Sequence, residues 1–207
     1  MKKKTILVAA IAVMLVAALV VGGTLAYFTD TKTADNTFTM GNVAITLDET
    51  NADQNAPTGS GRVTENTYNV YPGKTVTKDP TVHNMGSNAA YIRATVTVSN
   101  WATLSKELYP NAELANTLKE LVGSFGEGWS VVGAAADNSG AVTFTLKYDR
   151  QLATGADTAP MFQHVTVPAG LGNENASSFK TMTVQAQAIQ ADGFNTWEAA
   201  FNAFDGK

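Results

Sequence analysis

The sequence predicts a mainly β protein, a jelly-roll-like antiparallel β-sandwich with two short helices, preceded by an N-terminal signal helix. Apolar and polar residues alternate in several stretches that turn residues separate, which is typical of half-buried strands. Helical patterns do not alternate with these strands, so a parallel sheet is not favoured. The chain has 207 residues and no cysteine, and its length suffices for one core without disulfide bonds.

The N-terminal segment is predicted to be a secretory signal. A basic start at residues 1–4 is followed by an uncharged apolar run over residues 5–21 and a small residue at Ala26. We expect cleavage between Ala26 and Tyr27. An uncleaved membrane anchor stays open, because residues 5–26 have about the length of a membrane-spanning helix. In either case the remaining chain is expected outside the cytoplasmic membrane.

Residues 27–207 are predicted to form one secreted domain of 181 residues. Removal of residues 1–26 takes away three lysines and no acidic residue, so the formal net charge changes from −4 to −7. An acidic surface excludes nucleic acid as a partner class, because phosphate binding needs a basic stripe. The membrane is expected to be contacted only through the uncleaved signal.

The first half of the domain is predicted to contain short strands and one long loop. We expect a strand over residues 37–47 with a bulge near Gly41, and a loop over residues 48–66. A short strand over residues 68–71 ends at a type II turn formed by Pro72 and Gly73. Val76 and Val82 flank Lys78-Asp79-Pro80, and the proline indicates an edge strand.

The clearest strand is predicted over residues 90–99. Five apolar residues, from Ala90 to Val98, share one face, and five mostly polar residues share the other, which indicates a half-buried antiparallel strand. Residues 111–122 are predicted to form the first helix after the signal, since leucines recur there at helical spacing and Gly123 follows.

The second half is predicted to continue with strands and to end on a short helix. The expected strands cover residues 129–132, 142–148, 162–167 and 179–190, with loops at 151–160 and 170–178. Asn195 and Thr196 resemble a capping box that opens the last helix. Its apolar stripe is formed by Trp197, Ala200, Phe201 and Phe204. We expect this stripe to pack over an open end of the sandwich, and a partner or membrane surface stays open.

No catalytic, metal or cofactor site is predicted. The only two histidines, His83 and His164, lie 81 residues apart and are interpreted as strand or surface residues. Gly59-Ser60-Gly61 lies in a loop of low complexity and is no nucleophile elbow. Asp48, Glu49 and Asp53 fit no calcium-loop pattern and are interpreted as solvated loop charges. A secreted β domain without such a site is more often structural or adhesive.

Several blocks of the sequence resemble a known family. These blocks cover residues 22–30, 36–43, 71–80, 84–93 and 187–194. They are similar to exported proteins handled by the dedicated signal peptidase SipW, among them the biofilm matrix fibre protein TasA and camelysin.

The resemblance implies a jelly-roll subunit of extracellular biofilm matrix fibres, secreted by a Gram-positive bacterium or held at its surface. It implies donor-strand exchange, in which the freed N-terminal segment, about residues 27–40, adds a strand to the next subunit. The candidate donor residues are Tyr27, Phe28, Thr29, Phe38 and Met40. The expected partners are further copies of the chain, related matrix proteins and the signal peptidase.

Three alternatives stay open. In the first alternative, residues 37–47 pair with strands of their own subunit. A camelysin-like cell-surface metallopeptidase is the second, although no zinc motif is recognisable. A non-catalytic adhesin or carbohydrate-binding module on the same fold is the third.

Overall fold

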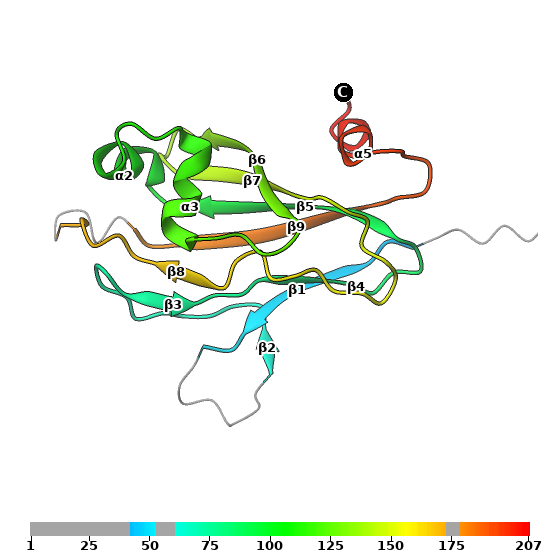
Figure 1. Cartoon of the computed structure of the whole chain (residues 1–207), viewed down its shortest axis with the longest axis horizontal. Coiled ribbons are helices and arrows are strands. Elements are labelled where there is room, and N and C mark those ends of the chain that lie inside the picture. The colour runs from blue at the N-terminus through cyan, green and yellow to red at the C-terminus, as the bar shows by residue number, and fades with distance from the viewer. Residues whose placement is uncertain (1–41, 53–60, 173–178) are drawn as a thin grey trace, which may run out of the picture. The chain divides into compact units, whose positions relative to one another are not determined.

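The computed structural model describes residues 42–52, 61–172 and 179–207 (Figure 1). The predicted signal segment, its cleavage pair Ala26 and Tyr27, and the donor candidates Phe28, Thr29, Phe38 and Met40 lie outside these described residues. The described chain is mainly β, with antiparallel strands in three sheets. This confirms the predicted fold class, whereas the jelly-roll connectivity stays a prediction.

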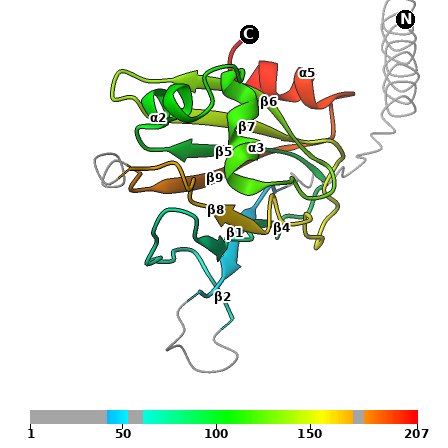
Figure 2. The same cartoon turned by 60° about the vertical axis from the view of Figure 1, so that its left-hand side comes forward.

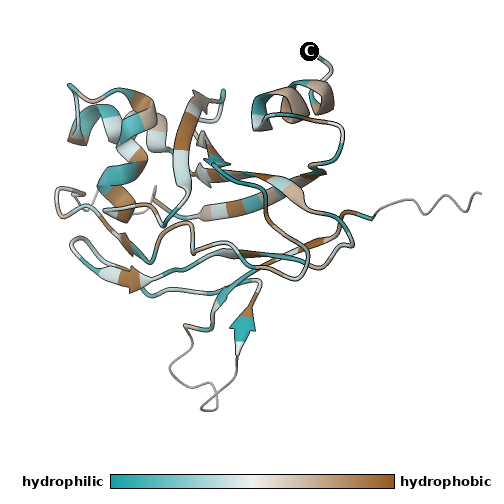
Figure 3. Ribbon diagram, turned by 45° about the vertical axis from the view of Figure 1, so that its right-hand side comes forward, coloured by the Kyte–Doolittle hydropathy of each residue, from teal (hydrophilic) through white to brown (hydrophobic). Residues whose placement is uncertain are grey.

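A four-stranded sheet forms the first layer. Its strands are β6 (Trp129–Ala136), β7 (Val142–Tyr148), β5 (Ala90–Val98) and β9 (Met182–Gln190), hydrogen-bonded in that order. The predicted alternation along β5 is confirmed, since Ala90, Ile92, Ala94, Val96 and Val98 are all at most 1 % exposed. Figure 3 shows apolar and polar residues alternating along these long strands. The sheet therefore turns one apolar face towards the core.

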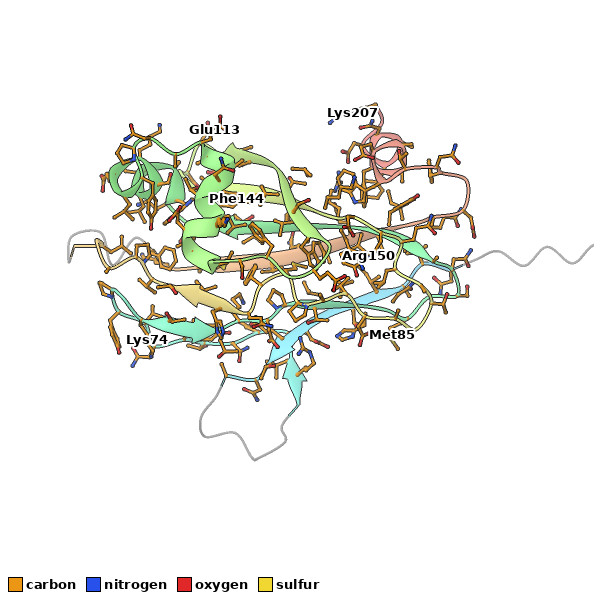
Figure 4. All side chains as sticks on the ribbon, viewed as in Figure 1. Lys74, Met85, Glu113, Phe144, Arg150 and Lys207 are labelled. Carbon is orange, nitrogen blue, oxygen red and sulfur yellow. The ribbon has the colours of Figure 1, made fainter. Side chains whose placement is uncertain are left out.

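Two smaller sheets form the second layer, which lies below the first in Figures 1 and 2. In one of them β1 (Ile45–Thr50) pairs with β2 (Arg62–Val63) and β4 (Thr81–Asn84). In the other, β3 (Thr75–Thr77) pairs with β8 (His164–Thr166). The core includes the fully buried side chains Val82, Ile92, Phe144, Met161 and Phe162, of which Figure 4 labels Phe144.

Several predicted boundaries in the second layer are wrong. β1 and β2 occupy part of the predicted loop 48–66, and the expected edge strand around Pro80 is two strands, β3 and β4, in different sheets. Residues 68–71 form no strand, because Tyr68 and Val70 line a groove instead of pairing. The type II turn is confirmed, since the Lys74 amide donates to the Tyr71 carbonyl at 3.0 Å and Gly73 has φ 83°.

Helix α2 (Trp101–Leu108) was not predicted. It begins after Asn100, which adopts a left-handed conformation at φ 53°. Trp101 is fully buried, and its Nε1 donates to Thr117 Oγ1 at 2.9 Å. Because Thr117 opens helix α3 (Thr117–Val122), this bond ties α2 to the helix predicted over residues 111–122. That predicted helix is shorter than expected, and its first turn is the 3₁₀ helix η1 (Leu114–Asn116).

The terminal helix α5 (Trp197–Phe204) begins as predicted. Thr196 caps it by accepting a hydrogen bond from the Ala199 amide at 3.1 Å. Ala200 and Phe201 are buried and Trp197 is partly buried, whereas Phe204 is 57 % exposed, so the apolar stripe is core only in part. The helix packs on the outer face of β5 and β9, however, and not over an open end. Within the described residues, no helix combines the length and apolarity that crossing a membrane requires.

Candidate functional site

A groove of about 580 Å³ opens between the first half of β9 and the second layer. One part of its lining is apolar and comes from β1, β3, β8 and the start of β9. These apolar residues are Leu47, Val76, Val165, Val167, Phe179, Met182 and Val184. The opposite wall is polar and is formed largely by residues 64–68 together with Asp48, Glu49 and Lys78.

The side chains of β9 that point into the groove are incompletely covered. Val184 lies opposite Val96 and Met182 lies opposite Val98 on the same face of the sheet. Both partners on β5 are fully buried, whereas Met182 and Val184 remain partly exposed. Among the described residues, the core is therefore incompletely covered beside β9.

The free edge of β9 borders this groove. Within the described residues β9 pairs only with β5, so its other edge presents backbone donors and acceptors along a nine-residue strand. The opposite edge strand of the sheet, β6, differs. Its ladder is broken by a bulge between Val131 and Gly133, and η1 packs against it. Bulges and covering elements prevent strand addition, and in the part of the chain that the structure describes β9 shows no bulge and pairs with no second strand.

The chain enters β1 at the end of the strand that precedes the groove. The Asn42 amide donates to Ser87 Oγ at 3.0 Å, and the Ser87 amide donates to the Asn42 carbonyl at 2.9 Å. Nearby, Asn88 donates to Asp192, just beyond the last residue of β9. The groove begins at Leu47, five residues and about 17 Å along the strand from Asn42, and continues towards the first residues of β9. Met85, labelled in Figure 4, lies beside this entry, since its amide donates to the Ala44 carbonyl at 2.8 Å.

A buried polar cluster stands in the wall of the groove. Glu49 follows Ile45 and Leu47 at alternate, inward-facing positions of β1, and its side chain is 6 % exposed. Lys78 Nζ lies 2.6 Å from Glu49 Oε2, and Asn66 Nδ2 donates to Glu49 Oε1 at 3.0 Å. The interpretation of Glu49 as a solvated loop charge is therefore wrong. The alternation from Ile45 is the sequence signal that would have placed it inside.

Tyr68 adds an aromatic ring to this cluster. Its ring centroid lies 5.8 Å from Lys78 Nζ. Burial, with the nearby negative charge of Glu49, raises the pKa of Tyr68 to about 12. The phenol therefore stays neutral at physiological pH.

A second polar cluster lies on the outward face of β1. Arg62 forms ion pairs with Asp48 and Asp79, and it also donates to Thr81 Oγ1 at 2.9 Å. Burial opposes the charge of both carboxylates, but hydrogen bonds outweigh this effect and lower the pKa values of Asp48 and Asp79. The hydrogen bonds to the Asp48 side chain come from Arg62 and His83. The cluster holds β2 against β1 and so positions the polar wall of the groove.

His83 is part of this second cluster. Its Nε2 lies 2.9 Å from Asp48 Oδ1 and its Nδ1 lies 2.6 Å from Asp157 Oδ1. Partial burial opposes protonation, but the two carboxylates together raise the pKa of His83. Because both ring nitrogens face carboxylates, His83 is arranged as an ion-pair residue.

The remaining metal-ligand candidates do not meet. His164 lies in β8, opposite Thr77, and is exposed. Asp48 and Glu49 point to opposite faces of β1, and Asp53 lies outside the described residues. No group of three His, Cys, Asp or Glu side chains with the arrangement of a metal site occurs in residues 42–52, 61–172 and 179–207.

Residues 1–101 match the family model described as camelysin metallo-endopeptidase. The match covers the segments that carried the resemblance in the first half of the sequence and confirms the resemblance to the camelysin family, whereas dependence on the signal peptidase SipW stays a prediction. No curated protein matches the chain. The described residues do not fit the metal that the family's description implies, since His83 is engaged by two carboxylates and His164 is remote from other ligands.

Proposed function

We propose, on the premise that residues 1–101 belong to the camelysin family, that the protein is a structural subunit of extracellular matrix fibres. In this proposal it is secreted, and the segment 27–40 of one subunit adds a strand to the next. The observation that carries the proposal is the edge of β9 with which no strand of the described residues pairs, beside a groove with an apolar lining.

Strand addition suits both the backbone and the side chains of this edge. An added strand supplies hydrogen-bond partners to the free edge of β9. Alternate side chains of that strand point into the groove, where they would cover Met182 and Val184. The segment 27–40 has apolar residues for such positions at Tyr27, Phe28, Phe38 and Met40, with threonines among them and no proline.

The donor segment is long enough to reach the groove of a neighbouring subunit. The segment and Gly41 together are 15 residues, which extend to about 50 Å. Because the segment and the groove are different parts of the subunit, insertion of the segment into a neighbour joins subunits head to tail. Such contacts do not close on themselves and therefore give filaments. Insertion of the segment into its own groove would instead give a stable monomer.

Two forms of the protein test the proposal. A protein that begins at Tyr27 should form filaments, whereas one that begins at Asn42 should stay monomeric. Electron microscopy and sedimentation compare them, and circular dichroism checks that both are folded. A synthetic peptide of residues 27–40 should bind the shorter form. Filaments from the form that begins at Asn42 would contradict donor-strand exchange.

A cell-surface metallopeptidase is the second candidate function, favoured by the description of the matching family. A peptidase of this kind should cleave casein, and a chelator and the substitutions His83→Ala and His164→Ala should each reduce that cleavage. Cleavage that all three treatments leave unchanged would contradict the metal mechanism. An adhesin would instead bind a glycan array as a monomer.

A further inference from the structure

Two side chains of the groove wall converge on one buried carboxylate. The Lys78 ammonium and the Asn66 carboxamide contact the two oxygens of one carboxylate, that of Glu49, at 2.6 Å and 3.0 Å. Lys78 lies between β3 and β4, Asn66 follows β2, and Glu49 is in β1, so three segments of the chain converge here. The ion pair between Lys78 and Glu49 does not require a third side chain, yet the Asn66 carboxamide is held on the same carboxylate.

We propose that Lys78 and Asn66 become joined by an intramolecular isopeptide bond, with Glu49 as the catalytic proton carrier. The Lys78 amine attacks Asn66 Cγ, so that an Nζ–Cγ bond forms and the Cγ–Nδ2 bond breaks. Glu49 takes two protons from Nζ in turn, one before the attack and one as the amide forms, and passes both to Nδ2, which leaves as ammonium. One alkylammonium and one carboxamide give one secondary amide and one ammonium ion, so no oxidant or cofactor takes part.

Lys78 and Glu49 lie close together and largely away from solvent. Their side chains are 12 % and 6 % exposed, and Lys78 Nζ lies 2.6 Å from Glu49 Oε2. The ring of Tyr68 lies near the nitrogen and limits the access of water to it. Glu49 is therefore placed to carry protons from Nζ to the leaving nitrogen.

The carbonyl of Asn66 is held for attack. The Ala52 amide donates to Asn66 Oδ1 at 2.8 Å, and Asn66 Nδ2 also donates to the Thr50 carbonyl at 2.9 Å. The Ala52 N–H points at the oxygen on which negative charge develops, as a donor of an oxyanion hole does. The leaving nitrogen faces Glu49, which supplies its protons.

The bond would link residues 66 and 78 across the wall of the groove. Both residues line the groove, as does Tyr68 between them. A covalent link limits the movement of this wall in the unfolded and folded chain alike. The inference stands on the cluster alone and does not depend on fibre formation.

Mass spectrometry of the isolated protein tests the bond. We expect an intact mass lower than that of the sequence by one ammonia. Trypsin should not cleave after acylated Lys78, so the peptide of residues 63–74 should appear joined to the peptide of residues 75–93. Separate peptides, with or without the loss of ammonia, would overturn the proposal.

Matched variants test the role of Glu49. Glu49→Gln keeps the size of the side chain but removes proton transfer, so its mass should equal that of its sequence and its peptides should be separate. Glu65→Gln, in the same wall, should keep the link. A linked product from Glu49→Gln would overturn the role of Glu49. Lys78→Arg gives the unlinked reference, and circular dichroism compares the folding of all variants.

Discussion

Val184 allows a direct test of the groove, because its side chain points inward from the uncovered strand β9. We expect Val184→Lys to weaken subunit addition strongly while the isolated subunit stays folded. The free energy of unfolding should change little, since this side chain is only partly covered before another strand is added. The substitution thus separates assembly from folding.

The size of the effect follows from burial. Full burial of a valine side chain stabilises by about 1.5–3 kcal/mol, and part of this is gained only when a donor strand covers Val184. A lysine loses that gain and brings a charge to an apolar lining, so we expect a loss of about 2–3 kcal/mol. Since about 1.4 kcal/mol changes an equilibrium constant tenfold, the critical concentration should rise about 30-fold to 150-fold.

Sedimentation of a dilution series measures the critical concentration, and thermal unfolding of the unassembled subunit measures its stability. Gln185→Lys is the matched control, because Gln185 is the next residue of β9 and is exposed on the opposite face. The reasoning is refuted if Val184→Lys assembles at the wild-type concentration, or if both variants lose assembly equally.

Three further predictions concern the stability of the subunit. Phe144→Ala removes a fully buried ring and should lower the free energy of unfolding by about 3–5 kcal/mol, measured with urea. Gly73→Ala places a β-carbon on a left-handed residue at φ 83° and should cost about 1–2 kcal/mol, with an unchanged urea slope. Partial burial opposes protonation of His83, but Asp48 and Asp157 outweigh it and raise the pKa of His83 in the folded state. The contribution of these ion pairs to the free energy of unfolding is therefore complete below about pH 6.5 and is lost as the pH rises through the higher folded-state pKa. Wild-type stability should therefore fall over that range, and His83→Gln should remove this fall in a series of unfolding curves.

Strand β5 could be predicted from sequence because its signal is local. Its apolar residues alternate without interruption from Ala90 to Val98, and every one of them is buried. The uncovered edge of β9 could not be predicted in the same way. It depends on strand order, which pairs residues about 90 positions apart, such as Val96 with Val184.

Helix α2 and the cluster at Glu49 show two other limits. Trp101 and Leu104 are the fully buried apolar residues of α2, and two residues are too few to establish helical periodicity. Glu49 was assigned to a loop because a charged residue usually ends an apolar strand. In the structure its burial is compensated by Lys78 and Asn66, which are remote in sequence.

The entry of the chain at Asn42 and the groove at the start of β9 give the subunit a polarity. A filament assembled in the proposed way has two chemically different tips, one with an empty groove and one with an unbound N-terminal segment. A free peptide of residues 27–40 should occupy only the first tip. A subunit without that segment could still accept a donor but could donate to no neighbour, so it would bind only at the second tip. The peptide would therefore stop growth at the first tip, and the shortened subunit would stop growth at the second.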